Sequence, residues 1–549
     1  MMRKPIKTAA ALVMALVMAS CAPAPAAQGT GAGAADYPRI DTREVRFDPP
    51  ISLVSVKSVD ATVKYLDGDT INDNIWTRAY AEQLGINLSY MWVVDAGQWQ
   101  QKLSATVMSG QMPDVFKCDA QMLKLLYDSD MLADLTDVYA QFAAAETVEI
   151  LTQDPLALPS ATIEGRLMGL PLTDAAIAGA NVLWIRQDWL DKLKIAPPET
   201  MDDLLEISRR FTQDDPDGNG AADTYGLEPN KTLWDGFGGL TGFFNGFHAY
   251  PGIWYEKDGR LVYGSVQPEM RDALSALRRM YEEGQINREF GVIDGNKVAE
   301  DIANGKCGIG YGPWWSPYHP LNLSQANYPD AYWQAYPLPS ADSAPALSQY
   351  GTAVTEYIVV RKGYEHPEAL IKLINLWTET FVRCTDDALR NAYLGSLDTP
   401  DVVKYKYTDF HLWEPNALLR ENNELQEALA RRDPSKLSND ASWRYQVMLA
   451  YFDQGIKEAW VEVATHGVNG SVSVLEGVAG GRGILNQFYG APTPVMSEKM
   501  VTLRTMEDEA ITNVIMGQPL ESFDAFVNSW YELGGQAITE EVNAWRTAE

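Results

Sequence analysis

Residues 87–118, NLSYMWVVDAGQWQQKLSATVMSGQMPDVFKC, contain two strand-like runs with a helical run between them. Asn87–Val94 is rich in β-branched and aromatic residues and predicts a strand. Gly97–Ser109 is predicted as a helix, and Asp114–Lys117 as a second, shorter strand. Strands that alternate with helices indicate βαβ units, so we expect an α/β fold with a largely parallel sheet.

The same alternation precedes this stretch. We predict a strand at Ala61–Leu66 and a helix at Trp76–Leu84. In open α/β sheets, ligands bind at the carboxyl ends of the strands. The loops after Leu66, Val94 and Lys117 are therefore the first places to expect a site.

A second α/β region begins near residue 181. Thr200 is expected to cap a helix over Met201–Phe211. The other elements predicted for this region and the following one are strands at Val182–Gln187, Gly308–Tyr311 and Tyr357–Arg361, and helices beginning at Asp188 and covering Pro268–Gly284, Glu421–Arg432, Trp443–Trp460 and Glu507–Met516.

Composition indicates a globular chain with more than one domain. The 549 residues are 46% hydrophobic and 21% charged, and 44 Lys and Arg stand against 74 Asp and Glu, for a net charge of −30. Because this acid excess repels phosphate backbones, we expect no nucleic-acid partner. Trp is abundant at 16 residues, which provides flat surfaces for stacking.

The N-terminus has the pattern of a secretory signal peptide. Residues 1–20 contain Arg3, Lys4 and Lys7 ahead of an apolar run that is too short to span a bilayer. Residues 18–21, MASC, resemble the lipobox of bacterial lipoproteins, which implies that Cys21 is lipidated. Residues 21–50 begin with an Ala-, Pro- and Gly-rich stretch that suits a flexible tether. The alternative is cleavage without a lipid.

Three cysteines remain, Cys118, Cys307 and Cys384. No CxxC or Cys/His spacing supports zinc. One disulfide with a free thiol and three reduced thiols are both open.

An EF-hand-like loop lies at residues 215–223. Oxygen side chains occupy relative positions one, three, five and nine, a Gly occupies position six, and a backbone carbonyl falls at position seven. The predicted Ca²⁺ ligands are Asp215, Asp217, Asn219, Asp223 and the carbonyl of Ala221. Position twelve is Gly226, so the bidentate Glu is missing, and water or Thr224 would have to replace it. The alternative is a turn rich in Asp, Asn and Gly.

Four segments together resemble the extracellular solute-binding lipoproteins of bacterial ABC importers, in the long LplA-like subgroup that handles oligosaccharides. They are Asp73–Arg78, Leu183–Leu190, Asp223–Leu227 and Phe488–Pro494. The resemblance extends from the lipobox almost to Glu549.

The resemblance implies a two-lobed, periplasmic-binding-protein-like fold with hinge strands and a ligand cleft between the lobes. Lobe one would comprise residues 51–175 and 346–395, and lobe two residues 176–345 and 396–549. The implied function is capture of an oligosaccharide by lobe closure and its delivery to the ABC permease. We expect a monomer, anchored by its N-terminal lipid to the extracellular face of the cell membrane.

Sugar binding needs flat aromatic rings and polar groups that form paired hydrogen bonds. Trp314 and Trp315 follow a predicted strand and a Gly-Pro, so at least one is expected to face the cleft; the alternative places both in the core. Trp76 and Asn74 follow the first predicted strand, although Trp76 could instead anchor its helix. Asp119 follows the strand that ends near Cys118 and could bind ligand or cap a helix.

Three more aromatic residues flank a Gly-rich stretch, 236–246, that suits a binding loop of lobe two. They are Trp234, Phe244 and Trp254.

A rival reading is a secreted glycoside hydrolase with two carboxylates in an aromatic cleft. No GxSxG, HExxH, P-loop or Rossmann glycine pattern occurs, and the five His residues are scattered. We therefore expect no enzymatic activity. A peptide-binding importer receptor is the other alternative.

Overall fold

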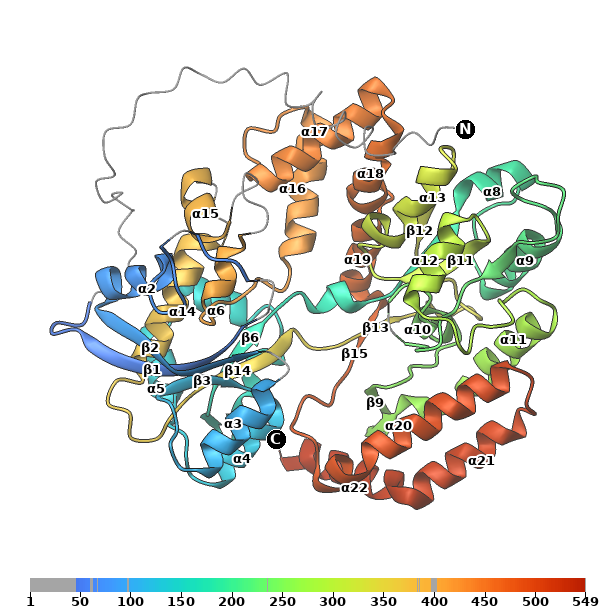
Figure 1. Ribbon diagram of the computed structural model, residues 1–549. Coiled ribbons are helices and arrows are strands. Elements are labelled where there is room, and N and C mark those ends of the chain that lie inside the picture. Colours follow the sequence, from blue (N-terminus) through green and yellow to red (C-terminus); the bar gives the residue numbers. More distant parts are fainter. Residues whose placement is uncertain are drawn as a thin grey trace, which may run out of the picture. The chain divides into compact units, whose positions relative to one another are not determined.

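The computed structural model describes residues 46–59, 63–66, 68–95, 98–234, 236–382, 384, 386–395 and 402–548. The predicted signal peptide, Cys21 and most of the tether lie outside these residues. Along the described chain, helices and strands alternate as Figure 1 shows.

The first sheets join the beginning of the chain to a segment far along it. β1 (Ile51–Val59) pairs in parallel with β2 (Ile86–Asp95), and α2 (Ile75–Ala79) lies between them in the sequence. In the next sheet, β14 (Val354–Val360) is the central strand, antiparallel to its two neighbours, β3 (Val115–Cys118) and β6 (Leu170–Thr173).

The second large sheet has the order β12-β7-β11-β8. β7 (Val182–Arg186) is buried throughout and pairs antiparallel with β11 (Cys307–Gly312) and β12 (Trp333–Tyr336). β8 (Tyr225–Leu227) pairs in parallel with β11. Three small pairs complete the strands: β4 (Thr162–Ile163) with β5 (Arg166–Leu167), β9 (Trp254–Lys257) with β10 (Arg260–Tyr263), and β13 (Ser348–Tyr350) with β15 (Gly483–Leu485).

Helices connect and cover these sheets (Figure 1). Their bounds are α3 (Trp99–Met108), α4 (Ala120–Asp128), α5 (Thr136–Phe142), α6 (Ala145–Leu151), α7 (Ala157–Ser160), α8 (Gln187–Leu193), α9 (Met201–Gln213), α10 (Thr241–Gly246), α11 (Met270–Glu282), α12 (Gly295–Ala303), α13 (Asn322–Asn327), α14 (Glu368–Phe381), α15 (Asp387–Tyr393), α16 (Ala417–Arg431), α17 (Asn439–Gln454), α18 (Trp460–His466), α19 (Ser471–Gly477), α20 (Pro494–Ile515), α21 (Glu521–Trp530) and α22 (Gln536–Ala548).

Most of the predicted elements form, and α9 shows why. Thr200 caps it as predicted: the Thr200 hydroxyl accepts from the Asp203 N–H at 3.2 Å, and the Asp203 carboxylate accepts from the Thr200 N–H at 2.9 Å. This reciprocal capping box satisfies N–H groups that no helical carbonyl can reach. Signals of this kind are local, so the sequence alone reveals them.

Three predictions were wrong. The first strand is β1, and the described part of Ala61–Leu66, residues 63–66, is not a strand. The predicted helix Trp443–Trp460 is broken near Gly455, whose left-handed backbone, φ 68°, ends α17. The sheets are also not largely parallel, because β14 and β11 enter their sheets from distant parts of the chain and run against β3, β6 and β7.

The largest apolar core joins the second sheet to the C-terminal helices. α20 packs against α11 and α21 through one buried face, formed by Leu503, Ile511 and Val514 among others. Since residues three and four apart share a helix face, Arg504 and Asp508 lie together on a different side of α20. The core thereby fixes which polar groups α20 presents.

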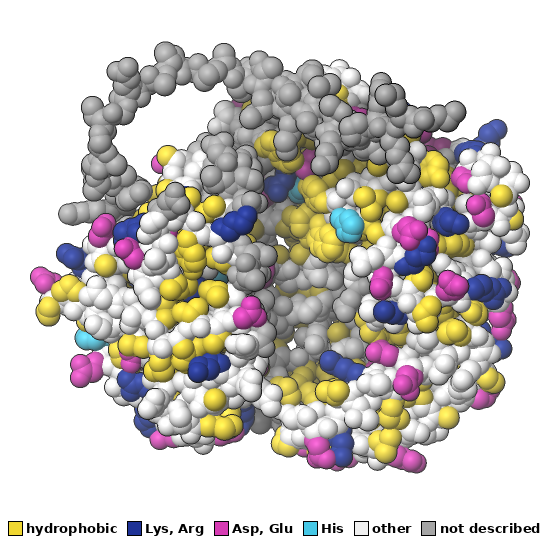
Figure 2. Space-filling model, viewed as in Figure 1, with side chains coloured by type: hydrophobic (Ala, Val, Ile, Leu, Met, Phe, Trp, Pro, Cys, Tyr) yellow, Lys and Arg dark blue, Asp and Glu magenta, His cyan; other side chains and the backbone are white. Residues whose placement is uncertain are grey.

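Cys118, Cys307 and Cys384 are free thiols. Of the two possibilities left open by the sequence, the structure shows three reduced cysteines. No helix among the described residues combines the length and apolar character that crossing a membrane requires. On the face in Figure 2, basic side chains are interspersed with acidic ones.

Candidate functional site

A cavity of about 410 Å³ lies beside Trp234 and the polar side of α20. Its walls come from five regions: residues 179–181, the loop and helix around Trp234 and α10, residues 251–263, residues 349–351 and residues 504–508. The volume falls within the range of about 300–1,000 Å³ that small-molecule sites occupy. An indole ring and several polar side chains on one wall, together with this volume, make the cavity the candidate binding site.

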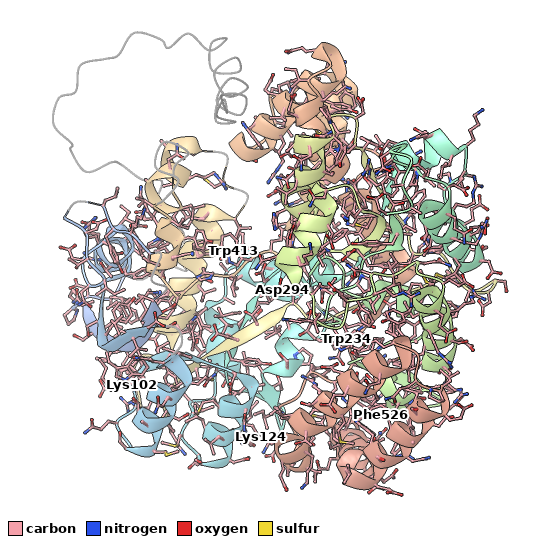
Figure 3. All side chains as sticks on the ribbon, turned by 45° about the vertical axis from the view of Figure 1, so that its right-hand side comes forward. Lys102, Lys124, Trp234, Asp294, Trp413 and Phe526 are labelled. Carbon is pink, nitrogen blue, oxygen red and sulfur yellow. The ribbon has the colours of Figure 1, made fainter. Side chains whose placement is uncertain are left out.

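Trp234 is the aromatic wall of this cavity. The indole is half-buried, it lies 5.6 Å from the ring of Phe244, and its Nε1–H donates to Asp508 Oδ1 at 2.7 Å. Figure 3 labels Trp234, and α20 lies beside it. Because a charged acceptor strengthens a hydrogen bond, Asp508 holds the ring in one orientation.

α20 contributes one cation and two acids to the cavity wall, Arg504, Glu507 and Asp508. Glu507 is buried and accepts a hydrogen bond from the hydroxyl of Tyr263 at 3.1 Å. Burial, reinforced by the charge of Asp508, raises the pKa of Glu507 to about 7, against the hydrogen bonds from Ser265 and Tyr263. Sequence reasoning missed this trio, because the predicted helix Glu507–Met516 began after Arg504, whereas α20 begins at Pro494.

The opposite wall supplies hydrogen-bonding groups that sequence reasoning also missed. Asn181 Oδ1 is buried without a hydrogen-bond partner among the described residues. Gln349 is occupied on both sides, since its Nε2 donates to the carbonyl of Pro251 at 2.7 Å and its Oε1 accepts from Asn245 at 2.9 Å. Asn181 is thus an acceptor with spare capacity facing a cavity.

Phe244 and Trp254, predicted to flank the binding loop, are core residues in this structure. Phe244 is fully buried, and Trp254 is 3% exposed with its ring 5.3 Å from that of Tyr263. Both rings pack against residues that line the cavity. Phe244 contacts Trp234, and Trp254 contacts Tyr263, whose hydroxyl donates to Glu507.

Asn74 and Trp76 lie in the first half of the chain, in structural roles. Asn74 is buried and caps α2, with its Oδ1 accepting from the Trp76 N–H at 3.0 Å and its Nδ2 donating to the carbonyl of Thr70 at 3.0 Å. The Trp76 ring, 1% exposed, stacks at 5.4 Å on Trp377. Neither Asn74 nor Trp76 exposes a surface that a ligand can reach, and neither lines the Trp234 cavity.

Asp119 is half-buried and caps α4. Its Oδ1 accepts from the Met122 N–H at 2.8 Å and its Oδ2 from Gln100 at 2.8 Å. Of the two roles predicted for Asp119, ligand binding and helix capping, these hydrogen bonds match helix capping.

Trp314 and Trp315 differ from each other. Trp314 is half-buried against a core cluster, with its ring 6.2 Å from that of His466. Trp315 is 43% exposed, more than Trp314, and its ring is therefore accessible for stacking. Neither lines the Trp234 cavity, so Trp315 remains a separate predicted contact.

A buried charge cluster sits near the carboxyl ends of β1 and β3. Lys57, 1% exposed, lies 3.1 Å from Asp409, and Lys117 bridges Asp409 at 3.5 Å and Glu356 at 3.0 Å. The two lysines hold the pKa of Asp409 below its usual value despite its burial. This is the sheet edge where the sequence predicted a site, but the residues are ones it did not name.

The calcium-loop residues come together between α9 and β8. Asp215 accepts from the N–H groups of Gly218 and Gly220 at 2.9 and 3.0 Å, and the Asn219 amide bridges Asp217 and Asp223 at 2.7 and 3.0 Å. These hydrogen bonds hold the polar side chains of the loop close to one another.

Two observations weigh against a complete calcium site. The Thr224 hydroxyl donates to the carbonyl of Phe211 at 2.8 Å, so it is committed elsewhere. Among the described residues, no three Asp, Glu, His or Cys side chains are grouped as a metal site.

The fold defines the class of protein to which the chain is similar, the two-domain solute-binding proteins. The structure matches an HMO-binding, ABC-transporter-associated solute-binding protein from Bifidobacterium longum infantis with a TM-score of 0.61 at 15% identity, over 91% of this chain and 99% of that one. This likeness confirms the predicted two-lobed, periplasmic-binding-protein-like α/β fold.

The chain belongs to the bacterial extracellular solute-binding protein family, whose model matches residues 65–380. Two Bacillus subtilis relatives support this. Lipoprotein LipO is 27% identical over 234 residues, covering 42% of this chain and 45% of LipO. The polygalacturonan/rhamnogalacturonan-binding protein YtcQ is 28% identical over 235 residues, covering 41% of this chain and 44% of YtcQ. The matches thus span less than half of these relatives.

Proposed function

We propose that this protein is the substrate-binding component of an ABC importer and that it captures an oligosaccharide. The observation that carries the proposal is the indole of Trp234, oriented by Asp508 on the wall of a cavity that also contains the unpaired acceptor of Asn181. A sugar offers an apolar C–H face to a ring and hydroxyls to polar groups, which is the chemistry this wall accommodates. Membership in the extracellular solute-binding family and the sugar ligands named for YtcQ and the HMO-binding protein support it.

The proposed mechanism is closure of lobe one, residues 51–175 and 346–395, on lobe two, residues 176–345 and 396–549. A ligand that contacts both lobes only when they are closed shifts the population toward the closed state. No bond is made or broken, so the chain is a receptor and not an enzyme, and it passes its ligand to the permease.

The location proposed for it is the extracellular face of the cell membrane, with a lipid on Cys21 as the anchor. Support comes from the residues 18–21, MASC, and from the family's extracellular character. Mass spectrometry of the mature protein tests this; an unmodified N-terminus would contradict it.

Ca²⁺ is proposed as a structural ion of the 215–223 loop. Asp215, Asp217, Asn219, Asp223 and the carbonyl of Ala221 would hold it, with water completing the shell. The spacing of oxygen side chains along the loop, and the hydrogen bonds that link Asn219 to Asp217 and Asp223, support this proposal.

Titration calorimetry against a panel of neutral and acidic oligosaccharides and of short peptides tests the function. We expect a glycan to bind with a stoichiometry of one, and Trp234→Ala to weaken it by roughly 1–3 kcal/mol, a loss typical of a stacking aromatic. Trp443→Ala removes an exposed indole on α17, outside the cavity, and should leave the affinity unchanged.

Three outcomes would count against the proposal. Cleavage products after hours of incubation would indicate the glycoside hydrolase, and binding of peptides alone would indicate the peptide receptor. Equal affinity of Trp234→Ala and the wild type would remove the cavity from the site.

A further inference from the structure

The polar wall of the Trp234 cavity has an unusual balance of charge. Among the described residues that line it, the charged ones are Arg504, Glu507 and Asp508. One guanidinium therefore stands against two carboxyl groups. A ligand group placed here meets two potential anions and one cation.

Both carboxyl groups are held in place by neighbours in the core. Glu507, 2% exposed, accepts from the Tyr263 hydroxyl at 3.1 Å, and Asp508 accepts from the Trp234 indole at 2.7 Å. Tyr263 itself stacks on the fully buried Trp530 at 5.2 Å. Each carboxyl group therefore has a hydrogen-bond partner that orients it on the cavity wall.

We propose that Glu507 and Asp508 select uncharged sugar residues against uronic acids in the Trp234 cavity, so that the ligand of this receptor is a neutral oligosaccharide. The inference rests on the proposed function and specifies its substrate class. Sugar hydroxyls can donate to the carboxylates and accept from Arg504, whereas a uronate can only accept and carries a repelled charge. Selection thus comes from a repulsive element as well as an attractive one.

The discrimination depends on pH through Glu507. The groups that face it are Tyr263 and Ser265 from one side and Arg504 and Asp508 from its own helix. Burial and the charge of Asp508 raise the pKa of Glu507 to about 7. Above this pH Glu507 is ionised and adds to the repulsion of a uronate, and below it the Glu507 carboxyl group is neutral and adds no repulsion.

Calorimetry at pH 8 tests the substrate class. The probes are neutral trisaccharides, the trisaccharides of galacturonate, mannuronate and glucuronate, and the methyl ester of trigalacturonate. We expect a neutral probe to bind and the uronates to bind at least tenfold more weakly. A uronate that binds more tightly than every neutral probe and its own ester would overturn the inference and leave the receptor function standing. Failure of every glycan to bind would overturn the proposed function and the inference with it.

Charge-removing variants test the two residues. Glu507→Gln and Asp508→Asn keep an acceptor for Tyr263 and Trp234, so the walls are retained. In competition between a uronate and the neutral ligand at pH 8, each variant should lower the ratio of neutral to uronate affinity by about tenfold. For the wild type, the same ratio should be lower at pH 5.5 than at pH 8.

Glu509→Gln is the matched control, because it removes the same charge from an exposed neighbour that does not line the cavity. If Glu509→Gln lowered the affinity ratio as much as the two cavity variants do, the net charge of the protein and not the cavity wall would account for the selection, and the inference would be overturned. A preference that stays constant from pH 5.5 to pH 8 would contradict the part assigned to Glu507.

Discussion

At the scale of the residue, burial decides what an ionisable side chain does. Glu228 follows β8 and is completely buried, and neither of its carboxyl oxygens has a hydrogen-bond partner among the described residues. Its neighbour Asp301 accepts from the Tyr225 hydroxyl at 2.9 Å. Burial, with the charge of Asp301, raises the pKa of Glu228 to about 8, so the folded chain keeps this proton at neutral pH.

Glu228→Gln should remove one source of pH dependence in stability. An unfolded Glu loses its proton near pH 4.5 and the folded one near pH 8, so the wild type loses stability as pH rises through this window. The variant should match the wild type at pH 4 and exceed it by roughly 2–4 kcal/mol at pH 8.5. Urea denaturation at both pH values measures this, with the exposed Glu146→Gln as a control; a parallel pH profile for both chains would refute it.

Trp76 and Trp234 show how far residue chemistry can be read from sequence. Trp76 follows the first predicted strand and Trp234 flanks the Gly-rich stretch 236–246, and both were predicted to contact ligand. Trp76 is buried on Trp377, which lies about three hundred residues further along the chain, whereas Trp234 lines a cavity. Nothing local separates them, because the partners that bury one and orient the other come from distant segments.

At the scale of the element, α20 and the 215–223 loop carry the testable chemistry. α20 was predicted only in part, as Glu507–Met516, and it begins at Pro494. Its buried face packs on α11, so its polar face is directed to the cavity. The loop owes its shape to Asp and Asn side chains that bond to nearby backbone N–H groups.

Ca²⁺ should stabilise the wild type through this loop. Ligand that binds only the folded state adds about 2.7 kcal/mol at a hundredfold excess over its dissociation constant. Differential scanning fluorimetry should show a melting temperature higher in CaCl₂ than in EDTA, and Asp217→Asn should remove the difference. Asp128→Asn, on the exposed end of α4, should retain it; equal melting points of the wild type in both buffers would eliminate the site.

At the scale of the whole molecule, the proposed closure has a direct measure. Small-angle scattering should show a smaller radius of gyration after addition of the glycan that calorimetry identifies, because closure brings two lobes together. Trp234→Ala at the same glycan concentration should retain the value of the unliganded wild type. An unchanged radius with the wild-type site saturated would rule out closure as the mechanism.

The sequence by itself determined the α/β class, the family and most helices, since these depend on periodicity, caps and short motifs that neighbouring residues encode. Thr200 with Asp203 and the oxygens of the 215–223 loop are examples. The tertiary structure decided the strand directions and the site. β14 became antiparallel to β3 and β6 because it returns from far along the chain, and Trp234, Asn181 and Asp508 come from distant segments that meet only in the folded chain. Contacts between distant segments depend on how the whole chain packs, which no local pattern records.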